Sequence, residues 1–245
     1  MSHFSQIVLG FVAIMALVTM VIAQGWTDAH ATFYGDPKGR DTEKGACGYN
    51  TITEGYGLAT TALSEALFNN GSTCGACYEI QCVNSKWCKP GAGSIKVTAT
   101  NLCPPSTGPS AWCNLPLQHF DLTQPMFLTI AVYQAGIVPV QYRRIPCVKQ
   151  GGVQFFMGGN PNFLLVLVYN VGGAGDVTNM KIKGGSNVWV QMSRNWGMNW
   201  QSSAEWLGQA LSFQVTISDG KSLEFDGVVP SNWQFGKSYQ GNSNF

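Results

Sequence analysis

Asp121, in the stretch PLQHFDLT, is the first candidate for proton-transfer chemistry. Its neighbours His119 and Phe120 can shield the carboxyl from water, and partial burial raises a carboxyl pKa because it disfavours the charged form. A raised pKa suits a general acid. An aspartate that caps the turn before TQP explains the same residues equally well. Asp121 is therefore a candidate acid, with His119 as its candidate neighbour.

A second group of polar side chains lies in HATFYGD. Thr32, Tyr34 and Asp36 would share one strand face, because side chains two apart point the same way. A hydroxyl, a phenol and a carboxylate on one surface could form a sugar-binding strip, although an ordinary strand end that runs into a turn is an alternative. Glycoside hydrolysis normally needs two carboxyl groups. Asp36 is the candidate partner of Asp121.

Large aromatic side chains are the candidates for stacking on sugar rings. Trp196 and Trp200 lie in RNWGMNWQ, a polar, turn-containing stretch where bulky rings are hard to bury. Because β-sandwiches also use tryptophan in their cores, a purely structural role stays open; Trp206, which precedes Leu207, fits a core position better.

The cysteines and the N-terminus predict export. All eight cysteines lie between Cys47 and Cys147, and an even number in an exported chain indicates disulfides, with many possible pairings. A redox pair or half a zinc site at CGAC is not favoured, since no second CxxC or paired His follows at ligand spacing. We expect no metal and no cofactor.

The N-terminal segment of 23 residues reads as a signal peptide. An apolar run from Ile7 to Ala23 ends in small residues at Val21 and Ala23, which indicates cleavage after Ala23. An uncleaved anchor is the alternative, although it needs about 20 apolar residues. Asn70 in NNGS is a glycosylation sequon on a predicted loop.

The elements that must position these residues change character along the chain. Residues 24–152 are cysteine-bearing and turn-rich, VKQGGVQFFMGGNPN provides a connection, and residues 160–245 contain clean strand patterns. LSFQVTISDGKSLEF alternates like a hairpin, and TTALSEALFNN alone resembles a short helix. The sequence predicts an all-β protein of two domains, a disulfide-stapled barrel followed by an antiparallel sandwich. A net charge of +1 gives no reason to expect nucleic acid binding.

Several motifs in register carry a family resemblance. HATFYG, GACGYN, ALFNNGSTCGACYEIQC, VTATNLCPP, HFDLTQPMF, AGIVPVQYRRIPC, LVLVYNVGGAGDV, MSRNWGMNWQ and LSFQVTISDGK resemble those of a plant expansin of the alpha class, and they cover nearly all of the mature chain. The resemblance implies a six-stranded double-psi β-barrel, similar to family 45 glycoside hydrolases, followed by an immunoglobulin-like sandwich that binds cellulose.

The resemblance also implies a function. Expansins loosen plant cell walls at acidic pH without hydrolysis, by separating cellulose from cellulose or xyloglucan. We therefore expect a secreted, monomeric wall protein that is no enzyme, with at most peripheral membrane association. The implied disulfides are Cys47–Cys74, Cys77–Cys147 and Cys82–Cys88, which leaves Cys103 and Cys113 as the fourth pair.

Carried over by position, Asp121 matches the family's essential acid, Thr32 and Tyr34 match its sugar-contacting pair, and the binding aromatics fall near Phe163 and Trp196. We rank Trp196 first, Phe163 second and Trp200 third.

Two departures from the family pattern bear on this expectation. The loop after TFYG reads DPKGRDTEK instead of a glycine-rich sequence, and so places Asp36 where related hydrolases carry their base. The alternative function is an inverting endo-β-1,4-glucanase with Asp121 as acid and Asp36 as base, which requires carboxyl groups about 6.5–9.5 Å apart. Pro37 can turn Asp36 away, and we favour the non-hydrolytic function. The segment between Cys103 and Cys113 is short and can reshape one rim of a groove.

Overall fold

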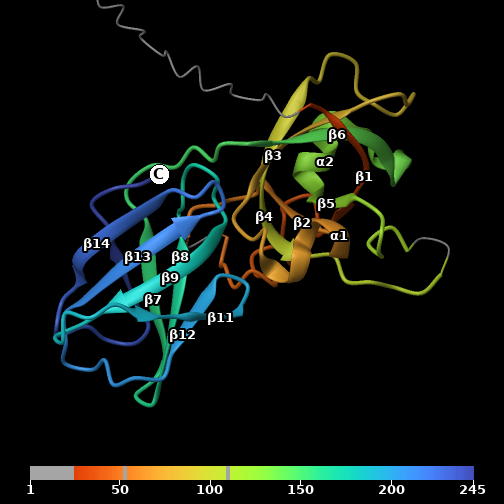
Figure 1. Cartoon of the computed structure of the whole chain (residues 1–245). Helices are drawn as coiled ribbons and strands as arrows, with labels where there is room; N and C mark the ends of the chain where they lie inside the picture. Colours follow the sequence, from red (N-terminus) through yellow and green to blue (C-terminus); the bar gives the residue numbers. More distant parts are fainter. Residues whose placement is uncertain (1–24, 52–53, 109–110) are drawn as a thin grey trace, which may run out of the picture.

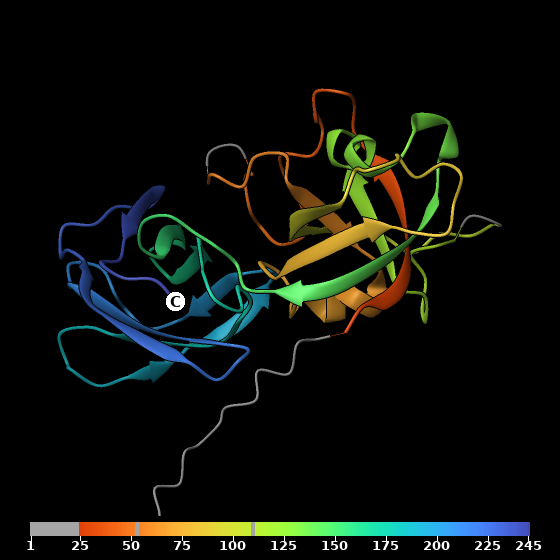
Figure 2. The same ribbon diagram turned by 90° about the horizontal axis from the view of Figure 1, so that it is seen from above.

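The computed structural model describes residues 25–51, 54–108 and 111–245. The predicted signal segment lies outside the described residues. Two β domains lie side by side (Figures 1 and 2). No helix in the described ranges is long and apolar enough to span a bilayer.

The first domain is a closed barrel with the strand order β1-β5-β2-β4-β3-β6 in the described chain. Neighbouring strands fill the barrel core with side chains of different size. Ala29 and Ala31 of β1 are small, Phe120 and Leu122 of the adjacent β5 are bulky, and all four are buried. The strands are β1 (Thr27–Tyr34), β2 (Thr60–Leu63), β3 (Cys77–Cys82), β4 (Ser94–Leu102), β5 (His119–Thr123) and β6 (Val138–Ile145).

Short helices join the barrel strands. They are α1 (Glu65–Phe68), η1 (Asn69–Gly71), α2 (Gln124–Ile130) and η2 (Tyr133–Ala135). The helix expected in TTALSEALFNN is only partly confirmed, because its first residues form β2 and the helix begins at Glu65. Helix α2 begins at Gln124, inside the TQP before which the sequence suggested a turn, and has Pro125 in its first turn, where a missing N–H costs nothing.

The second domain is a sandwich of a four-stranded sheet, β10-β9-β13-β14, and a five-stranded sheet, β11-β12-β8-β7-β15, as far as the chain is described. Phe155 stacks on Phe213 across the two sheets, with ring centroids 4.7 Å apart. The strands are β7 (Gln154–Asn160), β8 (Phe163–Tyr169), β9 (Val177–Lys183), β10 (Val190–Gln191), β11 (Ser193–Trp196), β12 (Asn199–Ser202), β13 (Leu211–Ile217), β14 (Ser222–Val229) and β15 (Lys237–Gln240). The hairpin expected in LSFQVTISDGKSLEF is confirmed as β13 and β14.

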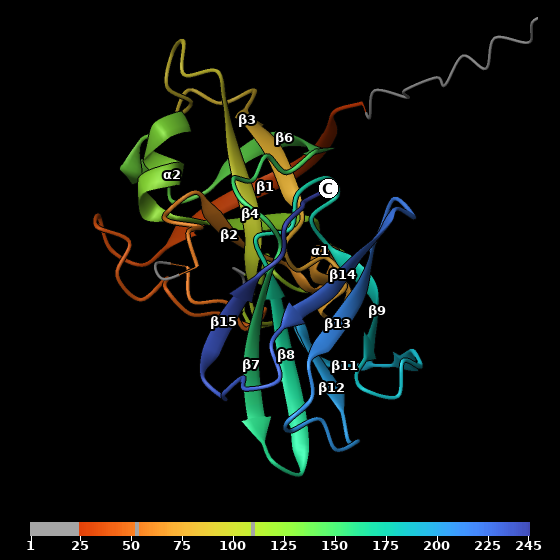
Figure 3. The same cartoon turned by 90° about the vertical axis from the view of Figure 1, so that its left-hand side faces the viewer.

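The predicted start of the second domain at residue 160 is wrong. Residues 154–160, which the glycines made look like a connection, form β7 and pair along their whole length with β8 (Figure 3). Phe155 and Met157 are buried, whereas Gln154, Phe156 and Gly158 are only partly buried. This alternation of buried and partly exposed residues, with a period of two, is that of a β-strand. The sandwich therefore begins at about the glycine pair Gly151–Gly152, and the true connection is much shorter.

Four disulfides staple the barrel, and the expected pairing is confirmed in full. The bonds are Cys47–Cys74, Cys77–Cys147, Cys82–Cys88 and Cys103–Cys113. Cys147 lies where the chain leaves the barrel, and its backbone pairs with Gly173 of the sandwich. The second disulfide therefore anchors the start of the second domain to the barrel.

Candidate functional site

The parallel pairing of β1 with β5 brings together the three polar residues that the sequence separates. Thr32 lies opposite Asp121, and His30 opposite His119, in the ladder. Thr32 Oγ1 donates to Asp121 Oδ1 at 2.7 Å and lies 2.7 Å from His119 Nε2. Because Thr32 uses its hydrogen for Asp121, its oxygen accepts from Nε2–H of His119. The result is a short relay from His119 through Thr32 to Asp121.

Asp121 carries the pKa expected of an acid. Burial raises its pKa above the ordinary 3.8, and the Thr32 hydrogen bond opposes that shift by stabilising the carboxylate. A group with a raised pKa keeps its proton at pH values where an exposed aspartate has lost it. The direction of this shift is the one that the candidate role of Asp121 as a proton donor requires.

His119 is held in its neutral form. Burial lowers its pKa to about 4, and His30 adds a smaller shift in the same direction. Its Nδ1 is buried and has no hydrogen-bond partner among the described residues. An imidazolium would bury an N–H with no acceptor there, which explains the direction of the shift. His119 therefore contacts the Thr32 hydroxyl as a neutral ring.

Asp36 does not occupy the place of a catalytic base. Its Oδ1 accepts the backbone N–H groups of Lys38 and Arg40, each at 2.9 Å, and its Oδ2 accepts from Arg40 Nε. These bonds lower the pKa of Asp36 and tie both oxygens to its own loop. Three hydrogen bonds from its own loop thus engage both carboxylate oxygens of Asp36. The prediction that Asp36 restores the second carboxylate therefore gains no support.

Tyr34 continues the strip beyond Thr32 on the same strand. Burial raises the pKa of its phenol, while the nearby Asn101 side chain acts in the opposite direction. No hydrogen bond of ordinary geometry joins Tyr34 Oη to another described group. That oxygen is itself buried, so the role of Tyr34 as a sugar contact stays a prediction.

A loop of the barrel carries this strip toward the second domain. Asn101 Oδ1 accepts the N–H of Ala46 at 2.8 Å, and the carbonyl of Cys47 accepts the N–H of Met198 at 3.0 Å. Gly48 has φ +87°, and a Cβ on it would lie 3.3 Å from the Trp196 ring. The turn between β11 and β12 therefore rests directly on the barrel.

The structure separates the three predicted binding aromatics. Trp196 is 48% exposed at the barrel edge, as expected for a stacking ring. Phe163 is half-buried at the start of β8. Trp200 is only 3% exposed and packs beneath the Arg194 guanidinium, so the prediction that its ring faces solvent is wrong. A register shift in β11 between Arg194 and Trp196 turns the two rings to different environments.

Trp112 is a site residue that the sequence analysis did not single out. It lines a hollow of about 360 Å³ together with Thr32, His119 and Ser106. Its ring lies 5.0 Å from that of His30. The adjacent Cys113 is the sequence signal that could have found it, because the Cys103–Cys113 bond holds this rim against the barrel.

Two further expectations concern the glycosylation sequon and the absence of a metal site. Asn70 is exposed in η1, so the sequon is accessible, and its occupancy stays a prediction. Within the described ranges, no group of three or more His, Cys, Asp or Glu side chains could hold a metal ion.

Comparison with known proteins identifies relatives over most of the chain. A model of the expansin C-terminal domain matches residues 153–230, and one described as lytic transglycolase matches residues 60–142. Expansin-A22 and Expansin-A23 of Arabidopsis thaliana are 57% and 56% identical over 224 residues, which is 90% of this chain and 80% and 81% of theirs. Expansin-A32 of rice (Oryza sativa subsp. japonica) is 52% identical over 227 residues, 90% of this chain and 84% of its own.

Solved structures agree on the fold. The apo structure of a Clavibacter michiganensis expansin matches with a TM-score of 0.70 at 17% identity, covering 90% of this chain and 98% of that one. A mutant of that protein, in complex with cellohexaose, matches with a TM-score of 0.69 and the same coverage.

Proposed function

Because the chain belongs to the alpha-class plant expansins, we propose that it loosens plant cell walls at acidic pH. In this proposal it disrupts non-covalent adhesion between cellulose and matrix glucans such as xyloglucan, and it does not cut either polymer. The observation that carries the proposal is the partly buried carboxyl of Asp121, whose pKa is raised by burial and whose candidate partner Asp36 is bound to Arg40.

A lone acid can rearrange sugar contacts without breaking a glycosidic bond. Protonated Asp121 donates a hydrogen bond to a glucan oxygen, and the Thr32 hydroxyl lies beside it, with Tyr34 further along the same strand. Each such bond replaces one between two polysaccharide chains. Inverting hydrolysis needs in addition a base that activates water on the opposite face of the sugar. Both oxygens of Asp36 are engaged by its own loop, so in this proposal the output is altered adhesion.

In this proposal the sandwich binds the glucan chain through aromatic side chains. Trp196 presents an exposed ring against the barrel loop that continues from Tyr34 and Asn101. Aromatic faces contribute large apolar contact with specific geometry. The cellohexaose complex of the bacterial expansin supports binding of a cellulose chain by this fold. We propose that one chain passes from Asp121 across to Trp196, with Phe163 as a further contact.

The four disulfides support a place outside the cytosol. Such bonds persist in oxidising compartments. We propose a secreted protein of the cell wall that acts as a monomer, with its N-terminal segment as the signal.

Extension of heat-inactivated wall strips under constant load tests the proposal. We expect purified protein to extend the strips at acidic pH and to lose this effect toward pH 7, because Asp121 then ionises. Equal extension at both pH values would contradict the proposed role of a protonated carboxyl.

Thr32→Val should shift the pH dependence toward neutral pH. The variant removes the donor that stabilises the Asp121 carboxylate, so the Asp121 pKa rises and protonated Asp121 persists to higher pH. We expect the pH of half-maximal extension to rise by about half to one unit. Thr32→Ser keeps the hydroxyl and should keep the original midpoint. A pH of half-maximal extension that Thr32→Val leaves unchanged would contradict the relay.

Trp196→Ala should weaken binding to cellulose by about tenfold, the value of about 1.4 kcal/mol expected for one lost stacking contact. The matched control is Trp87→Ala, because Trp87 is also exposed, at 38%, on a barrel loop far from the strip in sequence. Depletion assays on microcrystalline cellulose give both affinities. Equal losses of cellulose affinity in the two variants would contradict a specific role for Trp196, because any exposed aromatic ring would then contribute to binding.

A further inference from the structure

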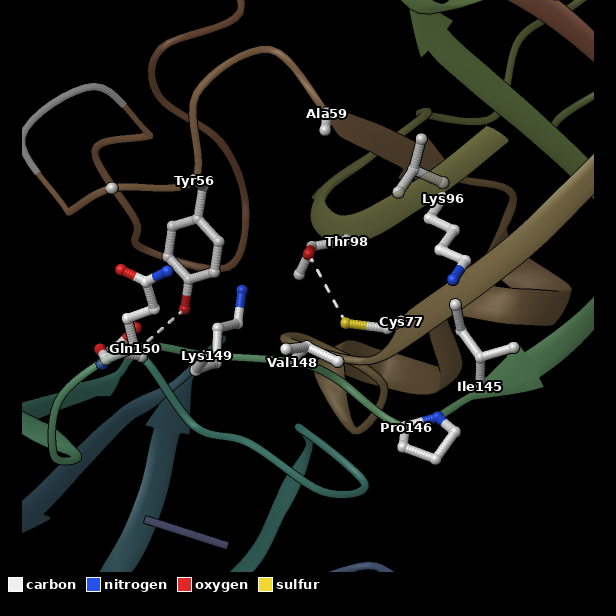
Figure 4. A pocket seen from close by; sticks show the side chains of 13 residues that line it. Tyr56, Ala59, Cys77, Lys96, Thr98, Ile145, Pro146, Val148, Lys149 and Gln150 are labelled. Atoms are coloured by element: carbon white, nitrogen blue, oxygen red, sulfur yellow. Dashed lines mark hydrogen bonds between the residues drawn. The ribbon is translucent and has the colours of Figure 1, made fainter. Parts of the chain in front are cut away.

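A second hollow, separate from the Asp121 site, lies between the two domains. It has a volume of about 530 Å³ and is lined by the barrel and by the segment that leaves it (Figure 4). Its polar side chains are those of Tyr56, Lys96, Thr98, Lys149, Gln150 and Asn170. None of these residues belongs to the Asp121 relay, so the candidate site around Asp121 does not account for this hollow.

The segment that carries Lys149 is held rigidly at both ends. Cys147 is bonded to Cys77 of β3, and its N–H donates to the Gly173 carbonyl at 2.7 Å. The carbonyl of Gln150 accepts Asn170 Nδ2 at 2.8 Å. Lys149 is therefore presented by a fixed backbone, as a binding residue should be.

Lys149 has a cationic group without a countercharge. Its Nζ lies 4.4 Å from the centroid of the Tyr56 ring. Burial lowers its pKa to about 8. Among the described residues it forms no ion pair. A partly desolvated ammonium in this position gains more from an anion than an exposed lysine does.

The surrounding charges leave the hollow positive. Lys96 lies on its other side (Figure 4). Glu79 faces Lys96 across the β3–β4 pair and its carboxylate interacts with that charge, but its hydrogen bonds go to Ser94 and to Arg143, whose Nη2 lies 2.6 Å from its Oε2. Glu54, on the loop of Tyr56, has a pKa raised by burial to about 7 and is neutral in acid.

We propose that this hollow binds the carboxylate of an acidic sugar, with Lys149 as the principal partner and Lys96 as the second. The Thr98 hydroxyl and the Gln150 amide suit sugar hydroxyls, and Tyr56, Ile145 and Val148 provide apolar contact. The volume matches that of small-ligand sites, about 300–1,000 Å³. The ligand class is thus a uronate, alone or as a unit of an acidic polysaccharide.

Titration calorimetry with the full mature chain tests this site at low ionic strength. The probes are oligogalacturonate, a neutral cello-oligosaccharide of the same length, and inorganic phosphate. We expect Lys149→Met to weaken oligogalacturonate binding at least tenfold and Lys96→Met to weaken it several-fold. Lys149→Arg should retain most of the affinity. Lys237→Met, which removes the same charge from an exposed strand of the sandwich, should change it less than twofold.

Three results would overturn the proposal. They are an affinity for oligogalacturonate that Lys149→Met leaves unchanged, equal losses in Lys149→Met and Lys237→Met, and phosphate binding as tight as that of the uronate. Thermal unfolding of each variant identifies a folding defect. If Lys149→Met proves to be misfolded, Lys149→Arg decides the question, and a loss of oligogalacturonate affinity in a folded Lys149→Arg variant would count against the site. The readout is independent of wall extension, so failure here leaves the role of Asp121 untouched.

Discussion

Asp121→Asn abolishes wall extension, to the level of a buffer control, if a protonated carboxyl performs the loosening step. Asparagine keeps the size of the side chain and still accepts from Thr32 Oγ1, so the barrel should fold normally. It cannot, however, present an acidic proton at any pH. The measurement is creep of heat-inactivated wall strips under load at acidic pH, with unfolding curves to confirm stability.

Asp36→Asn is the matched control for this experiment. It changes the same functional group on the same rim of the barrel, and the backbone bonds to Asp36 Oδ1 can persist in the variant. We expect extension close to that of the unaltered protein, since Asp36 is engaged with Arg40. Retained creep in Asp121→Asn would remove Asp121 from the mechanism. Loss of soluble-sugar release in Asp36→Asn would instead revive the glucanase alternative.

Removing the Cys77–Cys147 disulfide should be the most damaging change to stability. This bond closes a separation of 70 residues and joins the barrel to the start of the sandwich, whereas Cys82–Cys88 closes only 6. On the chain-entropy account the paired alanine variants should lose about 4 and about 2 kcal/mol of unfolding free energy, respectively.

Denaturant unfolding of both paired variants, followed at the barrel transition, measures this difference. Cys82→Ala with Cys88→Ala is the control, because it removes a disulfide without altering the interdomain anchor. An equal or larger loss in the control pair would contradict the claim that the long closure and the domain junction matter most.

Local patterns in the sequence were sufficient for much of the fold. Alternation located β13 and β14, and the family resemblance supplied the disulfide pairing that the spacing of the cysteines left open. The sequence predicts a connection where strand β7 lies, because Gly158 and Gly159 are typical of a linker. Only the pairing of these residues with β8 identifies them as a strand. The sequence suggests a turn before TQP and predicts no helix from Gln124, because Pro125 is typical of a turn as well as of the first turn of a helix.

The site depended on contacts that no local pattern encodes. Thr32 and Asp121 are 89 residues apart, and only the parallel β1–β5 register brings them within a hydrogen bond. Trp196 and Trp200 share one polar stretch, yet the register shift in β11 leaves one ring exposed and the other buried. Arg40 engages Asp36 through a loop turn whose geometry the sequence does not specify.

The most direct test of a non-cutting mechanism is to count new reducing ends in the same wall strips whose extension is being recorded. The prediction is that strips lengthen at acidic pH while the number of chain ends stays at the level of strips treated with Asp121→Asn. An increase in chain ends that grows in proportion to extension would contradict it, because loosening would then come from cleavage.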